Sequence, residues 1–302
     1  MRILVIGGSG FLSGTITRRA VAAGHDVWTV TRGKRPVPAG AHSIVVDRHD
    51  SAAFLESIRA GGSEFDIVID CICFTPDDAA QDIEAFRGIA GRIVFISTDF
   101  VYAPDGRRFP QPEYPAVFLT EGYGGKKRAA ELVFESLASD DTPWTILRPG
   151  HIYGPGSLLG CLPMHSRDQT LLDTIRAGRP LSLVGRGVFL QQPVFVDDLA
   201  DLAMGLGTDP AAKNTVFNAA GPDILESRRY YEIIGDVLER RVTVEELSIS
   251  SFLEENPDKA TFICHRVYTR DRIAATLTPA PATSIETGLA EHVRSILASR
   301  EK

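Results

Sequence analysis

The chain of 302 residues is 44% hydrophobic and carries a formal net charge of −7. The acidic balance argues against a nucleic-acid scaffold, which needs a basic surface, and no apolar run reaches the roughly 20 residues of a membrane span. The four cysteines, Cys71, Cys73, Cys161 and Cys264, are too few for a disulfide framework in so long a chain. We expect a cytoplasmic protein with buried thiols and no metal, because no further ligands are suggested near the Cys71–Cys73 pair.

Short β-rich runs alternate with helical patterns over the first two-thirds of the chain. The expected strands are nearly continuous apolar runs, typical of strands that helices cover on both faces; they span residues 2–6, 26–31, 43–46, 66–71, 92–97 and 144–148. The expected helices span residues 11–23, 50–60, 76–89 and 123–138. This alternation predicts an α/β fold with a Rossmann-type, doubly wound parallel sheet.

The pattern changes after residue 149, where Gly, Pro and Ser cluster in PGHIYGPGSLLGCLP. The remaining signals are a strand–helix pair at 194–205, a strand at 215–219 and a helix near 226–239, among irregular segments. We expect an NAD(P)-binding domain of residues 1–150 plus about 190–220. Residues 151–189 and 221–302 are expected to form a smaller C-terminal substrate-binding lobe.

The stretch GGSGFLSG at residues 7–14 follows the first expected strand. The N-terminal segment MRILVIGG has the pattern of a strand and not that of a signal peptide. A G-x-x-G turn before a helix lets the backbone approach a dinucleotide pyrophosphate, which the helix N-terminus attracts. The alternative is a glycine-rich turn that binds nothing. The cofactor contacts expected here are Gly7, Gly10, Phe11, Leu12 and, after the fourth strand, Cys71.

The second strand ends in basic residues. An acid at this position usually selects NAD, whereas this segment carries Arg32, Lys34 and Arg35. A cation cluster favours a 2′-phosphate, so the sequence favours NADP; the alternative is a solvated basic turn. Asp47, at the end of the third strand, is expected near the adenine.

Two later segments bear groups suited to acid–base chemistry. Tyr123 and Lys127, in YGGKKRAAE, are four residues apart and share a helix face. A cation beside a phenol lowers the phenol's pKa, so that a tyrosine can exchange a proton with a carbinol or carbonyl. Thr98, or Ser97, in FISTDFVYAP is placed to hold the same oxygen. A Tyr–Lys pair can also be ordinary helix surface.

Along the chain, a glycine turn is followed by the Thr98 segment and then by the Tyr123–Lys127 pair. Motifs in this order resemble those of the extended short-chain dehydrogenase/reductase family, the NAD(P)-dependent epimerase/dehydratases. The matching segments reach about residue 222 and are GGSGFLSG, DIVIDC, RIVFISTDFVY, YGGKKRAAE, LRPGHIYGPG, PVFVDDLADL and FNAAGP. The resemblance implies that Tyr123 is the acid/base and that Thr98 is its hydroxyl partner. Lys127 would lower the pKa of Tyr123 and bind the nicotinamide ribose. The resemblance also implies a homodimer formed through the helices carrying this pair.

Departures from the family pattern narrow the expected chemistry. Phe100 stands where dehydratases have a glutamate base, which counts against dehydration. Asp99 is expected near the substrate, as an auxiliary acid or a structural hydrogen-bonding group. His151 replaces a frequent asparagine and either contacts the substrate or packs as a loop histidine.

The expected substrate contact Gln191 replaces an arginine that often grips the diphosphate of a nucleotide sugar. A neutral amide cannot substitute for a bidentate cation, so an ordinary nucleotide-sugar substrate is disfavoured unless another arginine compensates. The candidates are Arg186, Arg240 and Arg270. Arg107 and Arg108, in the loop at 103–122 beside the site, either meet an anionic group or are solvated charges.

We therefore expect an NAD(P)-dependent oxidoreductase or epimerase, with NADP as the favoured cofactor, that acts on a secondary alcohol or ketone of a sugar-like substrate. The alternative is a non-catalytic, dinucleotide-sensing or RNA-binding member of the same fold. Such members tend to lose the Tyr-x-x-x-Lys pair, which this chain keeps. We expect no nucleic-acid or membrane partner.

Overall fold

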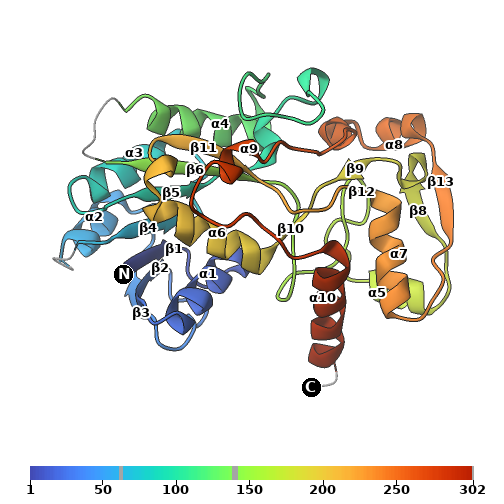
Figure 1. Cartoon of the computed structure of the whole chain (residues 1–302), viewed down its shortest axis with the longest axis horizontal. Helices are drawn as coiled ribbons and strands as arrows, with labels where there is room; N and C mark the ends of the chain where they lie inside the picture. The colour runs from blue at the N-terminus through green and yellow to red at the C-terminus, as the bar shows by residue number, and fades with distance from the viewer. Residues whose placement is uncertain (61–63, 138–141, 301–302) are drawn as a thin grey trace.

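The computed structural model describes residues 1–60, 64–137 and 142–300, and its centre is a sheet of seven parallel strands (Figure 1). The strand order is β11–β6–β5–β4–β1–β2–β3. The strands are β1 (Arg2–Ile6), β2 (Asp26–Thr31), β3 (His42–Val45), β4 (Ile67–Asp70), β5 (Ile93–Ile96), β6 (Trp144–Pro149) and β11 (Thr215–Ala219). The strand order reverses between β1 and β4, and doubly wound sheets bind ligands at the carboxyl edge beside such a point.

Helices cover both faces of the sheet, as the apolar strand runs predict (Figure 1). One face is covered by α1 (Phe11–Ala22) and α6 (Val196–Thr208), and the other by α2 (Ser51–Ala60), α3 (Pro76–Phe86) and α4 (Gly122–Glu135). Ile3 and Val5 of β1 face the first layer, and Leu4 and Ile6 face the second. All four side chains are fully buried, so β1 has no polar face.

A smaller lobe lies beyond one end of the sheet, at the right of Figure 1. Its helices and paired strands are α5 (Leu171–Arg176), β8 (Leu181–Val184), α7 (Ser227–Val237), β13 (Val244–Leu247), α8 (Ile249–Glu255) and α10 (Ile285–Arg300). Shorter elements are β7 (Ile152–Tyr153), β9 (Leu190–Gln191), β10 (Val194–Phe195), β12 (Leu225–Glu226), α9 (Asp271–Ala274), and the 3₁₀ turns η1 (Asp99–Val101), η2 (Pro104–Gly106), η3 (Gly185–Gly187), η4 (Pro210–Ala212) and η5 (Pro257–Phe262). The lobe has its own apolar core, which includes Tyr230 and Leu289.

The predicted fold class is confirmed, and the predicted elements differ from the observed ones mainly at their ends. The helix expected at 76–89 stops at Phe86 because Gly88 follows with a φ of +75°, a conformation that ends helices. The helix expected at 123–138 runs from Gly122 to Glu135. Its last expected residue, Ala138, lies outside the described residues.

The sequence pattern indicates no helix at residues 285–300, where the structure has α10. Gly288 lies inside it, and a glycine in a helix interior weakens the helical signal. A Cβ atom at this position would lie 2.4 Å from the hydroxyl of Tyr153, so tight packing against β7 requires the glycine. Among the described residues, no helix combines the length and the apolar character needed to cross a bilayer.

Candidate active site and dinucleotide pocket

The glycine-rich turn joins β1 to α1 at the carboxyl edge of the sheet. Gly7 and Gly8 have φ values of +115° and +46°, which L-residues with side chains rarely adopt. A Cβ atom on Gly8 would lie 2.5 Å from Cβ of Thr29, so the turn is pressed against β2. Gly10 caps α1, whose first amides have no partners within the helix. The turn therefore presents its backbone and a helix N-terminus together, as a pyrophosphate requires.

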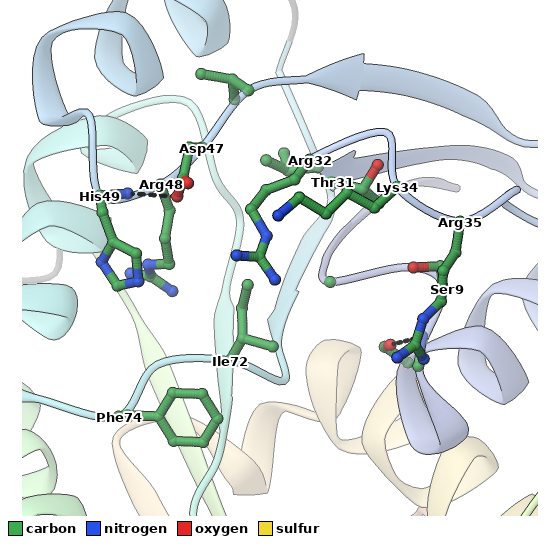
Figure 2. A pocket seen from close by; sticks show the side chains of 15 residues that line it. Ser9, Thr31, Arg32, Lys34, Arg35, Asp47, Arg48, His49, Ile72 and Phe74 are labelled. Carbon is green, nitrogen blue, oxygen red and sulfur yellow. Dashed lines mark hydrogen bonds between the residues drawn. The ribbon is translucent and has the colours of Figure 1, made fainter.

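A pocket of about 380 Å³ opens beside this turn (Figure 2). It brings together Gly7, Gly10, Arg32 and Asp47 of the predicted cofactor contacts. Figure 2 shows the Arg32 side chain extending from the end of β2 into the pocket, toward Ile72. Further lining residues are Ser9, Ser13, Val30, Thr31, Lys34, Arg35, Val46, Arg48, His49, Ile72 and Phe74. The pocket thus has a strongly basic wall where an adenosine ribose would lie.

Four predicted cofactor contacts do not line this pocket. Phe11 and Cys71 are half-buried against the apolar core, and Leu12 is 9% exposed within that core. Lys127 is buried behind the sheet edge, where its ammonium lies 5.3 Å from the ring centroid of Phe74. The missed residues Ile72 and Phe74 follow β4, and the rule that ligands bind at the carboxyl ends of strands could have found them.

Thr98 and Tyr123 come together where β5 ends and α4 begins. Tyr123 is the second residue of α4, and its side chain is 52% exposed. Partial burial raises the pKa of the Tyr123 phenol, and the charge of Asp99 acts in the same direction. A hydrogen bond with Thr98 and the positive charge of Arg167 oppose this shift. At neutral pH the phenol therefore keeps its proton and can donate it.

The ammonium of Lys127 is bonded to the backbone. Its Nζ donates hydrogen bonds to the carbonyl oxygens of Cys73 at 2.7 Å and Ile96 at 2.6 Å. Burial lowers the pKa of Lys127, whose side chain is 1% exposed. The pKa of Tyr123 is raised, chiefly by burial, and the role of Lys127 toward this phenol stays a prediction. The ammonium joins the segment that follows β4 to the end of β5.

The structure distinguishes Thr98 from Ser97 as the hydroxyl beside Tyr123. The Ser97 hydroxyl donates to Oε1 of Glu131 at 2.6 Å and is buried. Arg148 grips the same carboxylate with two bonds of 2.9 Å and 2.7 Å. The Ser97 hydroxyl is thus part of a buried ionic network between β5, β6 and α4. Thr98 is therefore the hydroxyl residue that lies beside Tyr123.

Asp99 is a structural ion in this structure rather than an auxiliary acid. Its carboxylate accepts hydrogen bonds from Nη1 of Arg266 and from the Tyr268 hydroxyl, and it is 3% exposed. Burial would raise the pKa of Asp99, but the positive charges of Arg266 and Arg107 lower it below its ordinary value. A carboxylate held ionised in this way has no proton to give. Asp99 therefore does not make the predicted substrate contact. Its carboxylate instead links η1 to the C-terminal segment.

His151 and Gln191 both carry a buried polar atom that has no partner among the described residues. These atoms are Nε2 of His151 and Oε1 of Gln191, while the Gln191 amide donates to the carbonyl of Leu162 at 3.3 Å. Burial lowers the pKa of His151 to about 4, with help from the charge of Arg167, so the imidazole is neutral at pH 7. Its ring lies 5.9 Å from that of Tyr230. Both residues retain free hydrogen-bonding capacity, as a substrate contact requires.

The cations that reach this region are not the ones proposed to compensate for Gln191. Within the described chain, Arg186 and Arg240 form no hydrogen bond or ion pair with Tyr123 or His151, and Arg270 donates a hydrogen bond to the carbonyl of Pro281. Arg107, by contrast, has a side chain that is only 6% exposed. It donates to the Tyr268 hydroxyl at 3.1 Å and to the Asp99 carbonyl at 3.0 Å. The expectation of a solvated loop charge is therefore wrong for Arg107.

Two carboxylates lie beside Cys73, contrary to the expectation that no further metal ligands are nearby. Ligand atoms of Asp70, Cys73 and Asp82 lie within 4.8 Å of one another. Arg48 fills this cluster and pairs with Asp70 and, at 3.0 Å, with Asp82. Burial and the Asp70 charge raise the pKa of Asp82 well above its usual range, whereas Arg48 and further hydrogen bonds lower that of Asp70. The Arg48 guanidinium thus already offsets the charge of this acidic cluster.

Comparison with known proteins relates part of the chain to a family. The profile of the NAD dependent epimerase/dehydratase family matches residues 78–220. The chloroplast stem-loop binding protein of 41 kDa b from Arabidopsis thaliana is 27% identical over 235 residues, which are 73% of this chain and 58% of that protein. The 2′-dehydrokanamycin reductase of Streptomyces kanamyceticus is 29% identical over 244 residues, or 80% of this chain and 67% of that enzyme.

Solved structures share the whole fold. The UDP-glucose 4-epimerase of Thermotoga maritima, solved with UDP-glucose, superimposes with a TM-score of 0.78 at 17% identity, covering 99% of this chain and 100% of that chain. The profile match therefore assigns residues 78–220 to the NAD dependent epimerase/dehydratase family, and the superposition shows that the chain shares the fold of this solved structure.

Proposed function

We propose that this protein is an NAD(P)-dependent oxidoreductase or epimerase that acts on a secondary alcohol or ketone of a sugar-like molecule. The observation that carries the proposal is the position of the Tyr123 phenol beside Thr98, at the same sheet edge as the Gly7–Gly10 turn. The 2′-dehydrokanamycin reductase among the relatives is named for a reduction of this kind. The chain spans 67% of that enzyme, so we do not assign the enzyme's substrate to this protein.

In the proposed reaction, some residues of this site transfer a proton and others position the substrate and the cofactor. A nicotinamide dinucleotide would supply or accept the hydride. The protonated Tyr123 donates its proton to the carbonyl oxygen during reduction, and its raised pKa keeps that proton available at neutral pH. The Thr98 hydroxyl binds the same oxygen. Lys127, held by two backbone carbonyls, would also bind the ribose of the nicotinamide.

NADP is the proposed cofactor. Arg32, Lys34 and Arg35 all line the pocket at the end of β2, where an NAD-selective site usually carries an acid. Guanidinium groups bind phosphate oxygens through paired donors, so the 2′-phosphate is assigned to this wall. Asp47 lies in the same pocket and is assigned to the adenine side.

We also propose that residues 1–150 and about 190–220 bind the dinucleotide, while 151–189 and 221–302 bind the substrate. The free polar atoms of His151 and Gln191 support this division, because each lies at the junction of the two parts. A homodimer through the helices that carry Tyr123 and Lys127 remains a prediction.

The test combines dinucleotide titration with an assay of hydride transfer on a panel of sugar ketones and alcohols. Stoichiometric consumption of NADPH would identify a reductase. A dinucleotide that stays bound through purification, with turnover and no net redox change, would identify an epimerase. The proposal fails if neither NADPH nor NADH binds at the Gly7–Gly10 turn.

A salt-dependent RNA-binding assay run in parallel addresses the non-catalytic alternative, because one relative is named for binding a stem-loop. With a net charge of −7, we expect weak RNA binding that disappears as salt rises and that does not compete with NADPH. Tight RNA binding without hydride transfer on any of the panel would favour the alternative.

A further inference from the structure

The backbone of Phe100 lies against both segments that carry the candidate acid–base groups. Its amide donates a hydrogen bond to the Thr98 hydroxyl at 3.2 Å. That hydroxyl accepts this bond and keeps its own proton for another partner. The Phe100 carbonyl faces Gly124, the residue after Tyr123, so closely that a Cβ atom on Gly124 would lie 2.0 Å from the carbonyl oxygen. The turn η1 and the start of α4 are thus packed backbone to backbone.

The side chain of Phe100 makes a further contact, with the Tyr123 ring itself. The two ring centroids lie 6.2 Å apart at an interplanar angle of 70°, which is an edge-to-face arrangement. Aromatic rings favour this geometry because the positive edge of one ring meets the negative face of the other. Tyr123 is 52% exposed. The contact therefore restrains a ring that is otherwise open to water over much of its surface.

The Phe100 ring is itself held from two further directions. The guanidinium of Arg266 lies 4.3 Å from its centroid, and the ring of Phe262 meets it edge to face at 5.7 Å. Arg266 is fixed in turn, because its side chain is 2% exposed and its Nη1 bonds to the Asp99 carboxylate. A chain of contacts therefore runs from a buried ion pair through the Phe100 ring to the Tyr123 phenol.

We propose that Phe100 is a positioning residue for proton transfer: its ring sets the orientation of the Tyr123 phenol, and its amide orients the Thr98 hydroxyl toward the same substrate oxygen. This inference rests on the proposed function and deepens it. The sequence marks Phe100 only as the residue that stands in place of a dehydratase glutamate. In the structure its ring touches both Arg266 and Tyr123. Phe100 thus supplies a rigid support at a position where it can transfer no proton.

Phe100→Leu tests the ring alone, because the amide and the carbonyl of residue 100 are kept. In a hydride-transfer assay we expect kcat to fall about tenfold or more, since moving a reacting group by about 1 Å can cost on the order of 100-fold. KM should stay nearly unchanged, because Phe100 is not assigned to the substrate. Phe100→Tyr keeps an aromatic ring and should restore most of kcat.

Phe118→Leu is the matched control for lost packing. Phe118 is also half-buried, and its ring lies 4.2 Å from the guanidinium of Arg128. Its aromatic neighbours are Tyr102 and Tyr114, each with a centroid 5.8 Å away. Urea unfolding should show lower stability for both leucine variants, whereas only Phe100→Leu should lose kcat. Equal loss of kcat in the two variants, or full kcat in Phe100→Leu, would overturn the proposal.

A titration of the Tyr123 phenol gives a readout that needs neither cofactor nor substrate. Tyrosine labelled with ¹³C at Cζ is followed by NMR across pH, and Tyr123→Phe identifies the signal among the 7 tyrosines. Burial raises the pKa of the Tyr123 phenol. Loss of the Phe100 ring should expose the phenol and move this pKa down toward its ordinary value. Phe118→Leu should leave the titration unchanged.

Phe262→Leu provides a second variant should Phe100→Leu fail to fold. It removes the ring that supports Phe100 on another side, so the Tyr123 titration should shift in the same direction by a smaller amount. A Tyr123 titration that is the same in the wild type and in whichever of these variants folds would overturn the proposal.

The two kinds of readout separate this proposal from the proposed function. If no sugar ketone or alcohol turns over but the Tyr123 titration follows Phe100, the oxidoreductase assignment fails and the support of the phenol by Phe100 stands. If hydride transfer is found and neither kcat nor the titration responds to Phe100→Leu, the positioning role fails and the oxidoreductase assignment stands.

Discussion

The carboxylate of Asp99 accepts a hydrogen bond from Arg266, which lies 167 residues further along the chain. The pair joins η1, directly after the Thr98 hydroxyl, to the segment that follows η5. The guanidinium of Arg266 also lies 4.3 Å from the ring centroid of Phe100, which in turn packs 6.2 Å from that of Tyr123. The C-terminal segment therefore builds the wall beside the candidate acid.

Removing the Asp99 charge should destabilise the protein. In Asp99→Asn, the buried guanidiniums of Arg266 and Arg107 lose the carboxylate that both of them face, and breaking one side of a buried ion pair costs about 3 kcal/mol. Urea unfolding of the variant measures the loss in free energy of unfolding. Asp105→Asn, on the exposed turn η2, is the matched control and should change stability little. Equal stability of both variants would contradict the ion-pair role.

Tyr123→Phe should abolish turnover and spare dinucleotide binding. The phenol supplies the proton, and loss of a general acid lowers the rate constant by about 100-fold or more. Tyr123 does not line the dinucleotide pocket, so the dissociation constant for NADPH should be unchanged. Tyr114→Phe, which removes another phenol near α4, is the control for an unspecific effect. Full activity of Tyr123→Phe would remove Tyr123 from the mechanism.

The rate of reduction should also depend on pH in a defined direction. Reduction needs the protonated phenol of Tyr123, and the pKa of that phenol is raised above its ordinary value. The rate constant for reduction should therefore stay level through neutral pH and fall only as pH rises through that raised pKa. A fall centred near pH 7 would mean that a different group, or a phenol with a lowered pKa, donates the proton.

Arg32→Gln should weaken NADP⁺ binding selectively. The Arg32 guanidinium extends into the basic wall of the pocket (Figure 2), and loss of a charge-assisted bond to phosphate weakens affinity about tenfold. Binding of NAD⁺, which has no 2′-phosphate, should change little. Fluorescence titration with both dinucleotides measures the ratio, with Arg241→Gln as an exposed control far along the chain. Equal weakening of both dinucleotides would argue against a 2′-phosphate contact.

His151→Asn should make the protein less sensitive to mild acid. The pKa of His151 is about 4 in the folded protein, against about 6.5 for an ordinary histidine. The unfolded chain thus binds the extra proton first, so wild-type stability falls as pH drops from about 6.5 to about 4, by at most about 3 kcal/mol. Urea unfolding across this range should show a shallower decline for His151→Asn than for the exposed control His49→Asn. Parallel declines would contradict the buried neutral imidazole.

Much of the fold follows from local pattern. The runs around Ile3–Ile6 and Ile67–Asp70 contain no polar side that could face water, so they predict strands covered on both faces. Their carboxyl ends must meet at one sheet edge, and this brings the Gly7–Gly10 turn, Arg32 and Asp47 into one pocket, as the sequence predicts. Gly288 shows the limit of this reasoning, since a residue chosen for close packing against Tyr153 weakens the pattern of its own helix.

By itself, the sequence determined the parallel sheet, the glycine turn with its basic neighbour and the Thr–Tyr–Lys order, because each depends on residues close together in the chain or on where strands end. Only the tertiary structure decided that Lys127 binds backbone carbonyls and that Asp99 is neutralised by Arg107 and Arg266. The physical reason is that a charge finds its partner through space. Segments more than a hundred residues apart come into contact only after the core has packed, and no local sequence pattern predicts that contact.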